Sequence, residues 1–158
     1  MPEVRILAAA EDWRAFREVR LRALADAPDA FGATLVEAET LPDEVWRERA
    51  AAARGRALLV LEDDRPVAMG GVFVPDGEDP MIWGMWTAPE ARGCGHAGRL
   101  LRELLDWCRA RDLAVRLHVT EGNEAARRLY VGHGFVPTGT WEPLRPGSEL
   151  RIEELRLG

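Results

Sequence analysis

Hydrophobic residues recur at helical spacing in three stretches of the chain, 12–25, 42–53 and 99–112. The clearest pattern is in the last stretch, where the apolar side is formed by Leu100, Leu101, Leu104, Leu105 and Cys108. Charged residues occupy the opposite side, as expected for a helix that covers a core. A shorter helix is expected to start at Asn123, whose side chain can cap it, and to run through Tyr130. We expect 31–34 to be a loop or a short turn.

Short apolar runs between these helices predict β-strands. The expected strands are 4–8, 57–62, 67–74, 81–87, 115–119, 135–141 and 150–157. The polar turn 63–66 predicts that the second and third strands form a hairpin. Trp83 and Trp86 are three positions apart, so on a regular strand they should face opposite sides.

The resulting order is β-α-α-β-β-β-α-β-α-β-β, without a linker or an internal repeat. This order predicts one α+β domain over residues 1–158. We expect a central mixed sheet of about six to seven strands, mostly antiparallel, with helices on both faces.

Composition narrows the class of partner. The chain has 158 residues, of which 47% are hydrophobic and 30% charged, and a net charge of −6. An acidic chain is not a typical partner of nucleic acid or of an anionic membrane surface. No apolar run is long enough to cross a bilayer, and no signal peptide is visible. Cys94 and Cys108 do not have metal-ligand spacing, so we expect free thiols, no bound metal and a cytoplasmic protein.

The glycine-rich turn from Arg92 to Gly98 lies between an expected strand and an expected helix. Its backbone N–H groups and the positive end of the helix dipole favour phosphate oxygens. The spacing does not match the dinucleotide fingerprint, and no Gly-Lys-Ser/Thr follows. Gly93 and Gly95 allow close backbone approach, and Arg92 adds a cation. A turn that only starts a helix, or a plain nucleotide- or phosphate-binding domain, are the alternatives.

A second motif lies downstream, where Asn123-Glu-Ala-Ala-Arg-Arg-Leu-Tyr130 is followed by Gly132, Gly134 and Phe135. With both motifs, the chain resembles the GNAT superfamily of acyl-CoA-dependent N-acetyltransferases. That family pairs an Arg/Gln-x-x-Gly-x-Gly/Ala turn with a later Asn-x-x-Ala-x-x-Leu-Tyr-x-x-x-Gly-Phe segment. The resemblance is strongest over 81–137 and implies acetyl-CoA as co-substrate, bound where two strands splay apart.

The resemblance also implies site residues. It assigns pyrophosphate binding to the turn and main-chain pairing with pantetheine to the strand before it, so that the expected cofactor-binding residues are Met85, Trp86, Thr87, Arg92, Gly93, Cys94, Gly95, His96, Ala97, Gly98 and Asn123. Asn123 can equally be a plain helix cap. The resemblance makes Tyr130 the catalytic acid that protonates the departing thiolate, and ring packing against the sheet is the alternative.

The implied reaction is direct attack of a primary amine, on a small molecule or a protein, at the thioester of acetyl-CoA. A backbone N–H from residues 85–87 polarises the carbonyl, and Cys94 is not a nucleophile. The alternative function is a non-catalytic acyl-CoA-binding or sensory module on the same fold.

Several features of this reaction remain open at this point. The general base is one of Glu37, Glu39, Glu78, Asp79 or water, and neither His96 nor His118 is expected to be the base. The acceptor, the use of acyl groups other than acetyl and a possible homodimer are open too.

Overall fold

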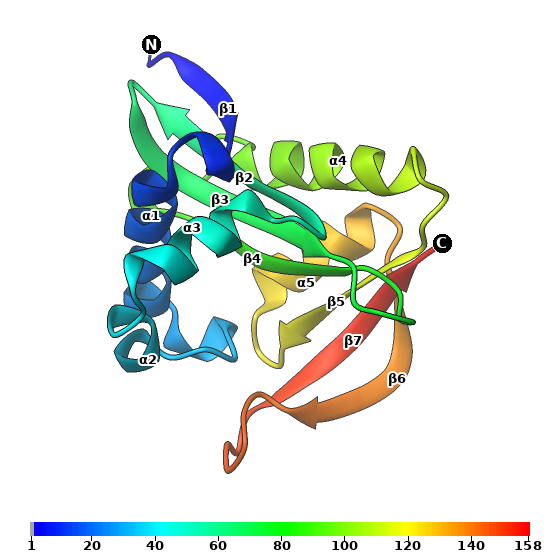
Figure 1. Cartoon of the computed structure of the whole chain (residues 1–158). Coiled ribbons are helices and arrows are strands. Elements are labelled where there is room, and N and C mark those ends of the chain that lie inside the picture. The colour runs from blue at the N-terminus through cyan, green and yellow to red at the C-terminus, as the bar shows by residue number, and fades with distance from the viewer. Residues whose placement is uncertain (1) are drawn as a thin grey trace.

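The computed structural model describes residues 2–158 and contains a seven-stranded sheet in the order β1-β2-β3-β4-β5-β7-β6 (Figure 1). Its strands are β1 (Val4–Ala8), β2 (Gly55–Glu62), β3 (Arg65–Phe73), β4 (Met81–Thr87), β5 (Val115–Thr120), β6 (Val136–Pro143) and β7 (Arg151–Leu157). Every neighbouring pair is antiparallel except β4 and β5, which are parallel. The mixed, mostly antiparallel α+β architecture expected from the sequence is therefore confirmed.

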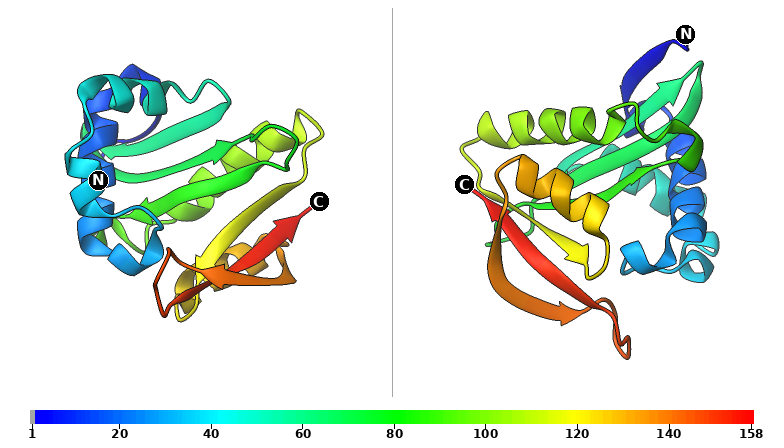
Figure 2. Two further views of the ribbon diagram at one scale, coloured as in Figure 1. Left: turned by 60° about the horizontal axis from the view of Figure 1, so that its bottom comes forward. Right: turned by 180° about the vertical axis from the view of Figure 1, so that it is seen from behind.

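Helices cover both faces of this sheet. They are α1 (Trp13–Asp26), α2 (Leu35–Glu39), α3 (Asp43–Ala51), α4 (His96–Arg109) and α5 (Glu124–Gly132), with short 3-10 turns η1 (Ala9–Glu11), η2 (Pro28–Ala30) and η3 (Pro89–Ala91). Seen from behind, α4 and α5 lie in front of the sheet, and the three N-terminal helices lie on its other side (Figure 2). Within residues 2–158 there is no helix of the length and apolar character that a membrane crossing requires.

Local sequence signals explain most of these elements. The carboxylate of Asp12 accepts a hydrogen bond from the Ala15 N–H and caps α1. The leucine face of α4 is fully buried against the sheet, as its spacing predicts. Between β2 and β3, Asp63 and Asp64 both have positive φ, 48° and 67°, as a tight hairpin turn requires.

The expected loop over 31–34 is confirmed, and a short helix that the sequence did not predict, α2, follows it. This helix begins where the Thr34 hydroxyl accepts a hydrogen bond from the Glu37 N–H. Helix α4 begins at His96, three residues before the expected start, because the glycine turn leads directly into it. The Thr34 cap and the glycine turn before His96, neither of which hydrophobic periodicity detects, set the starts of these two helices.

The expectation that Trp83 and Trp86 face opposite sides of the sheet is wrong. The pairing of β3 with β4 shifts register between Met69 and Gly71, and Gly84 in the facing part of β4 has a φ of +67°. This bulge adds one residue to β4, so both indoles face α1. Trp83 packs edge-on against Phe16, and Trp86 donates from Nε1 to Asp26 at 3.0 Å.

Candidate active site

The parallel strands β4 and β5 separate soon after they begin. Their pairing covers only Met81 with Arg116 and Ile82 with Leu117. Beyond Ile82 the β4 edge that faces β5 has no strand partner in the described part of the chain, while its other edge still pairs with β3 as far as Thr87. Backbone N–H and C=O groups on this open edge are available to an extended ligand, in the manner of an added strand.

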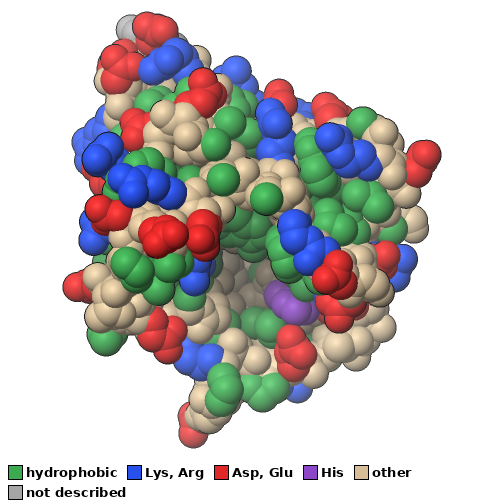
Figure 3. All heavy atoms as spheres, viewed as in Figure 1, with side chains coloured by type: hydrophobic (Ala, Val, Ile, Leu, Met, Phe, Trp, Pro, Cys, Tyr) green, Lys and Arg blue, Asp and Glu red, His purple; other side chains and the backbone are tan. Residues whose placement is uncertain are grey.

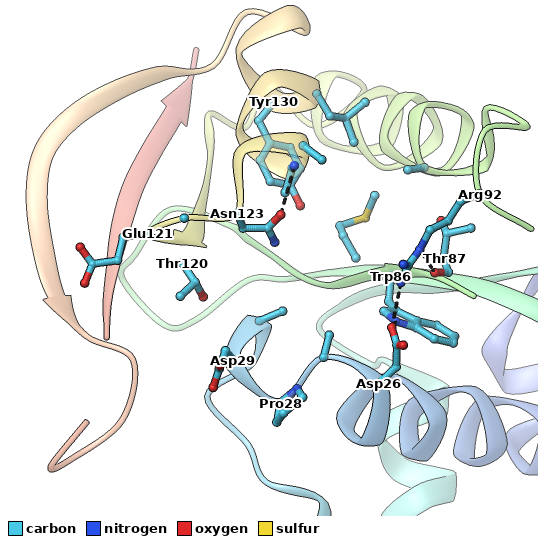
Figure 4. Close-up of a pocket in the computed structure, with 18 of the residues that line it drawn as sticks. Asp26, Pro28, Asp29, Trp86, Thr87, Arg92, Thr120, Glu121, Asn123 and Tyr130 are labelled. Carbon is cyan, nitrogen blue, oxygen red and sulfur yellow. Dashed lines mark hydrogen bonds and ion pairs between the residues drawn. The ribbon is translucent and has the colours of Figure 1, made fainter. Parts of the chain in front are cut away.

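A cleft of about 720 Å³ continues from this opening. Its walls come from the C-terminal ends of β4 and β5, the start of α4, one side of α5 and the turn η2 (Figure 4). A smaller crevice of about 60 Å³ lies between the splayed strands and shares Tyr130, Asn123 and Met85 with the cleft. Figure 3 shows a hollow on this side of the molecule, with a histidine side chain visible in its wall.

The glycine turn ends the cleft at the N-terminus of α4. Among residues 2–158, the backbone N–H groups from Gly93 to Gly98 make no hydrogen bond to a main-chain acceptor, and the first N–H bonded within the helix belongs to Arg99. Gly93 and Gly95 have φ values of +81° and +83°, which only glycine adopts without strain. A Cβ at either position would meet nothing within 4 Å, so the turn faces open space. These free N–H groups fit a pyrophosphate.

Arg92 and His96 each have a protein partner beside this turn. The Arg92 guanidinium donates to Asp26 at 2.8 Å and to the Thr87 carbonyl at 3.0 Å, so its charge is already paired. His96 is 5% exposed and its Nε2 lies 2.7 Å from Glu62 Oε1. Ligand atoms of Glu62, Cys94 and His96 all lie within 4.8 Å of one another, but the close His96–Glu62 contact already occupies two of them. The pair ties the start of α4 to the end of β2.

Tyr130 reaches into the cleft from α5 (Figure 4). Its ring is 6% exposed and packs edge-on against Phe135, with the ring centroids 6.1 Å apart. Burial raises the pKa of Tyr130 far above its ordinary value, so the phenol keeps its proton at neutral pH. The hydroxyl has no hydrogen-bond partner among residues 2–158 and lies where both the cleft and the crevice meet. Both expectations for Tyr130, ring packing and a phenol at the cleft, are thus compatible.

Asn123 lies at the entrance of α5, and its Oδ1 accepts a hydrogen bond from the Ala126 N–H at 3.4 Å. The helix cap is therefore present, and the same side chain also lines the cleft. Met85, Trp86 and Thr87 line the opposite wall. The structure brings all four residues, Arg92 and Ala97 into one cleft.

None of the acidic residues considered as a base lines the cleft or the crevice. Glu78 is paired with Arg116 at 2.9 Å, and Asp79 with Arg156 at 2.9 Å. Glu37 and Glu39 are exposed on α2 and belong to neither cavity wall.

His118 is instead a basic residue that lines the crevice, as Tyr130 does. Its Nε2 lies 3.7 Å from Glu142 and 3.8 Å from Glu154, on β6 and β7. Both carboxylates can hold an imidazolium once it forms. The alternation of β5, with Leu117 and Val119 buried, indicated that His118 faces the other side. Nothing local indicated that this side borders the crevice, because β6 and β7 join β5 from distant parts of the sequence.

Comparison with known proteins now defines the class. A family model described as the acetyltransferase (GNAT) family matches residues 12–135, and the chain belongs to that family. Among curated proteins, a sequence search finds no match.

The fold is also found in solved structures. One is a GNAT-family acetyltransferase from Streptococcus pneumoniae, at 18% identity and a TM-score of 0.78 over 98% of this chain and 99% of that one. Another is a ribosomal-protein-alanine N-acetyltransferase from Brucella melitensis, at 21% identity and a TM-score of 0.77 over 98% of each chain. A third, over 66% of this chain and 62% of its own, is a putative streptothricin acetyltransferase from Bacillus anthracis in complex with acetyl coenzyme A, at 17% identity and a TM-score of 0.57.

Proposed function

We propose that this protein transfers the acetyl group of acetyl-CoA to a primary amine by direct attack, within one domain over residues 1–158. The observation that carries the proposal is the position of Tyr130, where the cleft meets the splay between β4 and β5. Its phenol is buried and protonated, and it has no hydrogen-bond partner within residues 2–158. The cytoplasm remains its expected location, and acyl groups other than acetyl remain open.

The cleft fits the co-substrate in three separate places. The free N–H groups of the turn from Gly93 to Gly98 suit a pyrophosphate. The open edge of β4 at Met85, Trp86 and Thr87 suits the amides of a pantetheine arm. Arg92 contributes indirectly, since its bonds to Asp26 and the Thr87 carbonyl hold the end of β4 against α1. Cys94, His96, Ala97 and Gly98 contribute backbone N–H groups.

Acetyl-CoA supplies the thioester, and the chain supplies the proton transfers. The amine nitrogen forms a bond to the carbonyl carbon, and the carbon–sulfur bond breaks. Tyr130 gives its proton to the departing sulfur, and His118 accepts the proton that the amine loses. Both side chains then exchange protons with water, so that an acetylated amine and free CoA are the only products. A backbone N–H of residues 85–87 polarises the carbonyl.

Thiol release from acetyl-CoA with a panel of amines tests this function against a binding module. We expect CoA binding and turnover with at least one amine. Binding without turnover across the panel would favour the sensory alternative, and no CoA affinity would reject both. The chain contains no lysine, because all 21 of its basic Lys and Arg positions are arginine. Acetyl-lysine detected by mass spectrometry therefore comes from a peptide acceptor and not from the enzyme.

His118→Gln tests the proton acceptor. We expect a fall in kcat of about 10²-fold or more, typical of general acid–base groups, with little change in acetyl-CoA affinity. His133→Gln is the matched control, since His133 bonds to the Leu129 carbonyl at 2.8 Å and lines neither the cleft nor the crevice. Equal kcat values in the two variants would leave water as the proton acceptor.

A further inference from the structure

Arg20 is a largely buried cation that forms no ion pair with any of the residues 2–158. Its Nη1 atom is buried and has no hydrogen-bond partner within residues 2–158. Burial, with a smaller contribution from the charge of Arg49, lowers the pKa of its guanidinium to about 10. By contrast, two nearby arginines each form an ion pair: Arg22 on α1 with Glu90 at 2.6 Å, and Arg92 with Asp26, the last residue of α1, at 2.8 Å. A charge left unpaired in a partly closed site is costly unless a ligand completes it.

Aromatic side chains hold this guanidinium in place. Its carbon lies 5.0 Å from the centre of the Phe31 ring and 6.0 Å from that of Trp83. Nη1 also lies 3.4 Å from the position that a Cβ on Gly84 would occupy. The planar group is therefore fixed against the bulge of β4, where the strands begin to splay.

Arg20 stands between two cavities. Phe31, Gly84 and Trp83 border the crevice that contains Tyr130 and His118. On the other side, Arg20 and Trp83 line a separate pocket of about 670 Å³ between α1, α3 and the ends of β2, β3 and β4. Trp83 thus belongs to both walls, and Arg20 lies beside it.

The second pocket has an apolar wall and a charged edge, where three arginines, Arg20, Arg49 and Arg54, outnumber one acid, Glu48. Its walls include the rings of Phe16, Trp46 and Phe73 together with Val72. Arg49 adds a second guanidinium that forms no ion pair among residues 2–158, whereas Arg54 in the same wall is paired with Asp76. The pocket thus combines aromatic rings with guanidinium groups that form no ion pair among residues 2–158, in a chain whose net charge is −6. Such a pocket can select a ligand that has both an apolar part and a negative charge.

We propose that Arg20 binds the carboxylate of the acceptor and that the acceptor is an apolar α-amino acid, whose side chain enters the aromatic pocket. One carbon separates the amine from the carboxylate in such a molecule. A carboxylate on Arg20 therefore keeps the amine near the crevice of Tyr130 and His118, and the side chain extends past Trp83. This inference rests on the proposed function for its reaction, but the binding preference exists without turnover.

The test compares each amino acid with its carboxamide, which keeps the size and the amine but removes the negative charge. Calorimetry and thermal shift with L-phenylalanine, L-leucine and L-tryptophan, each against its amide and with CoA present, measure binding alone. We expect the wild-type protein to prefer the carboxylate form at least tenfold for one or more pairs, as hydrogen bonds to a charged group allow. The same preference should appear in KM when acetyl transfer is measured.

Arg20→Met should abolish the preference, bringing the ratio within each pair to about one, while acetyl-CoA affinity stays at the wild-type value. Arg14→Met is the matched control, because Arg14 lies exposed on the same helix, stacked on Trp13, and lines neither cavity. Arg20→Lys keeps the charge but not the planar fork, so it should retain a reduced preference. It also provides an independent second variant at the same position.

Two results overturn the proposal. One is a wild-type protein that binds no carboxylate in the panel more tightly than its amide. The other is a folded Arg20 variant with the wild-type ratio. If carboxylates bind through Arg20 but no amine is acetylated, the proposed reaction fails and the binding site stands.

Discussion

Replacing Tyr130 with phenylalanine removes one oxygen atom from the candidate site and leaves the surrounding packing in place. The ring stays against Phe135, in the edge-on contact with a centroid distance of 6.1 Å. The phenolic hydroxyl makes no hydrogen bond within residues 2–158, so no protein partner is left unsatisfied by its removal. We therefore expect the free energy of unfolding to change by less than about 0.5 kcal/mol.

The effect on catalysis should be much larger. A positioned general acid typically contributes about 10²- to 10⁴-fold in rate, which corresponds to about 3–5 kcal/mol of activation free energy. Acetyl-CoA affinity should remain within about twofold, since the hydroxyl acts on the departing sulfur and not on the bound ground state. The expected signature is a lower kcat with an unchanged dissociation constant.

Single-turnover rates are the appropriate assay, because product release limits kcat in many enzymes and would hide a change in chemistry. Calorimetry with CoA and a urea melt complete the comparison. The raised pKa of Tyr130 adds a pH test: since the folded protein keeps the phenol protonated, the wild-type rate should show no alkaline fall from this group up to about pH 10. A wild-type single-turnover rate in Tyr130→Phe, at equal stability, would remove Tyr130 as the acid.

The other predictions concern the turn, the cap and the buried cation. Gly95→Glu should abolish CoA binding measured by calorimetry. Gly77→Glu is the control and should bind CoA normally, because Gly77 has a similar positive φ and similar open space around it. Equal binding by both variants would contradict the assignment of the turn to phosphate. Asn123→Asp should keep the α5 cap and the melting temperature but weaken CoA binding severalfold, and unchanged binding would make Asn123 a cap alone. Arg20→Met should raise the free energy of unfolding at pH 7 by about 1–3 kcal/mol, measured in urea melts. The pKa of Arg20 is lowered to about 10 in the folded protein, which means that folding is less favourable with the charged guanidinium by roughly that amount. With this sign the wild-type protein should gain stability as the pH rises above about 10, and a destabilised Arg20→Met would contradict the reasoning.

Much of the fold can be predicted from sequence because local patterns encode it. The leucine spacing of α4, the apolar runs of β2 and β3 and the Asp63-Asp64 turn each specify an element within about 15 residues. The glycine turn and the Asn123–Tyr130 segment likewise predict two walls of the cleft, and the structure places both around one cavity. Helix α2 was not predicted, because its five residues are too few to show a helical period of hydrophobic positions.

The acceptor side that we propose could not be predicted, because distant segments form it. His118 reaches its two carboxylates only after β6 and β7 have joined β5, about 24 and 36 residues later in the chain. In the sequence, Arg20 cannot be distinguished from the other charged residues of the amphipathic helix α1. Its lack of a carboxylate is a property of everything packed around it, including Phe31 and Trp83.

The bulge at Gly84 links both halves of the site. By adding one residue to β4, it rotates Trp83 and Trp86 onto the α1 face, where Trp83 can wall the aromatic pocket and Trp86 can bond to Asp26. The same irregularity lies just beyond Ile82, where β4 leaves β5 and its open edge begins. A side chain at Gly84 would adopt a strained positive φ and approach the Arg20 guanidinium to 3.4 Å. Gly84 therefore lies both where the open edge of β4 begins and beside the Arg20 guanidinium, so the donor and acceptor sites that we propose meet where the strands part.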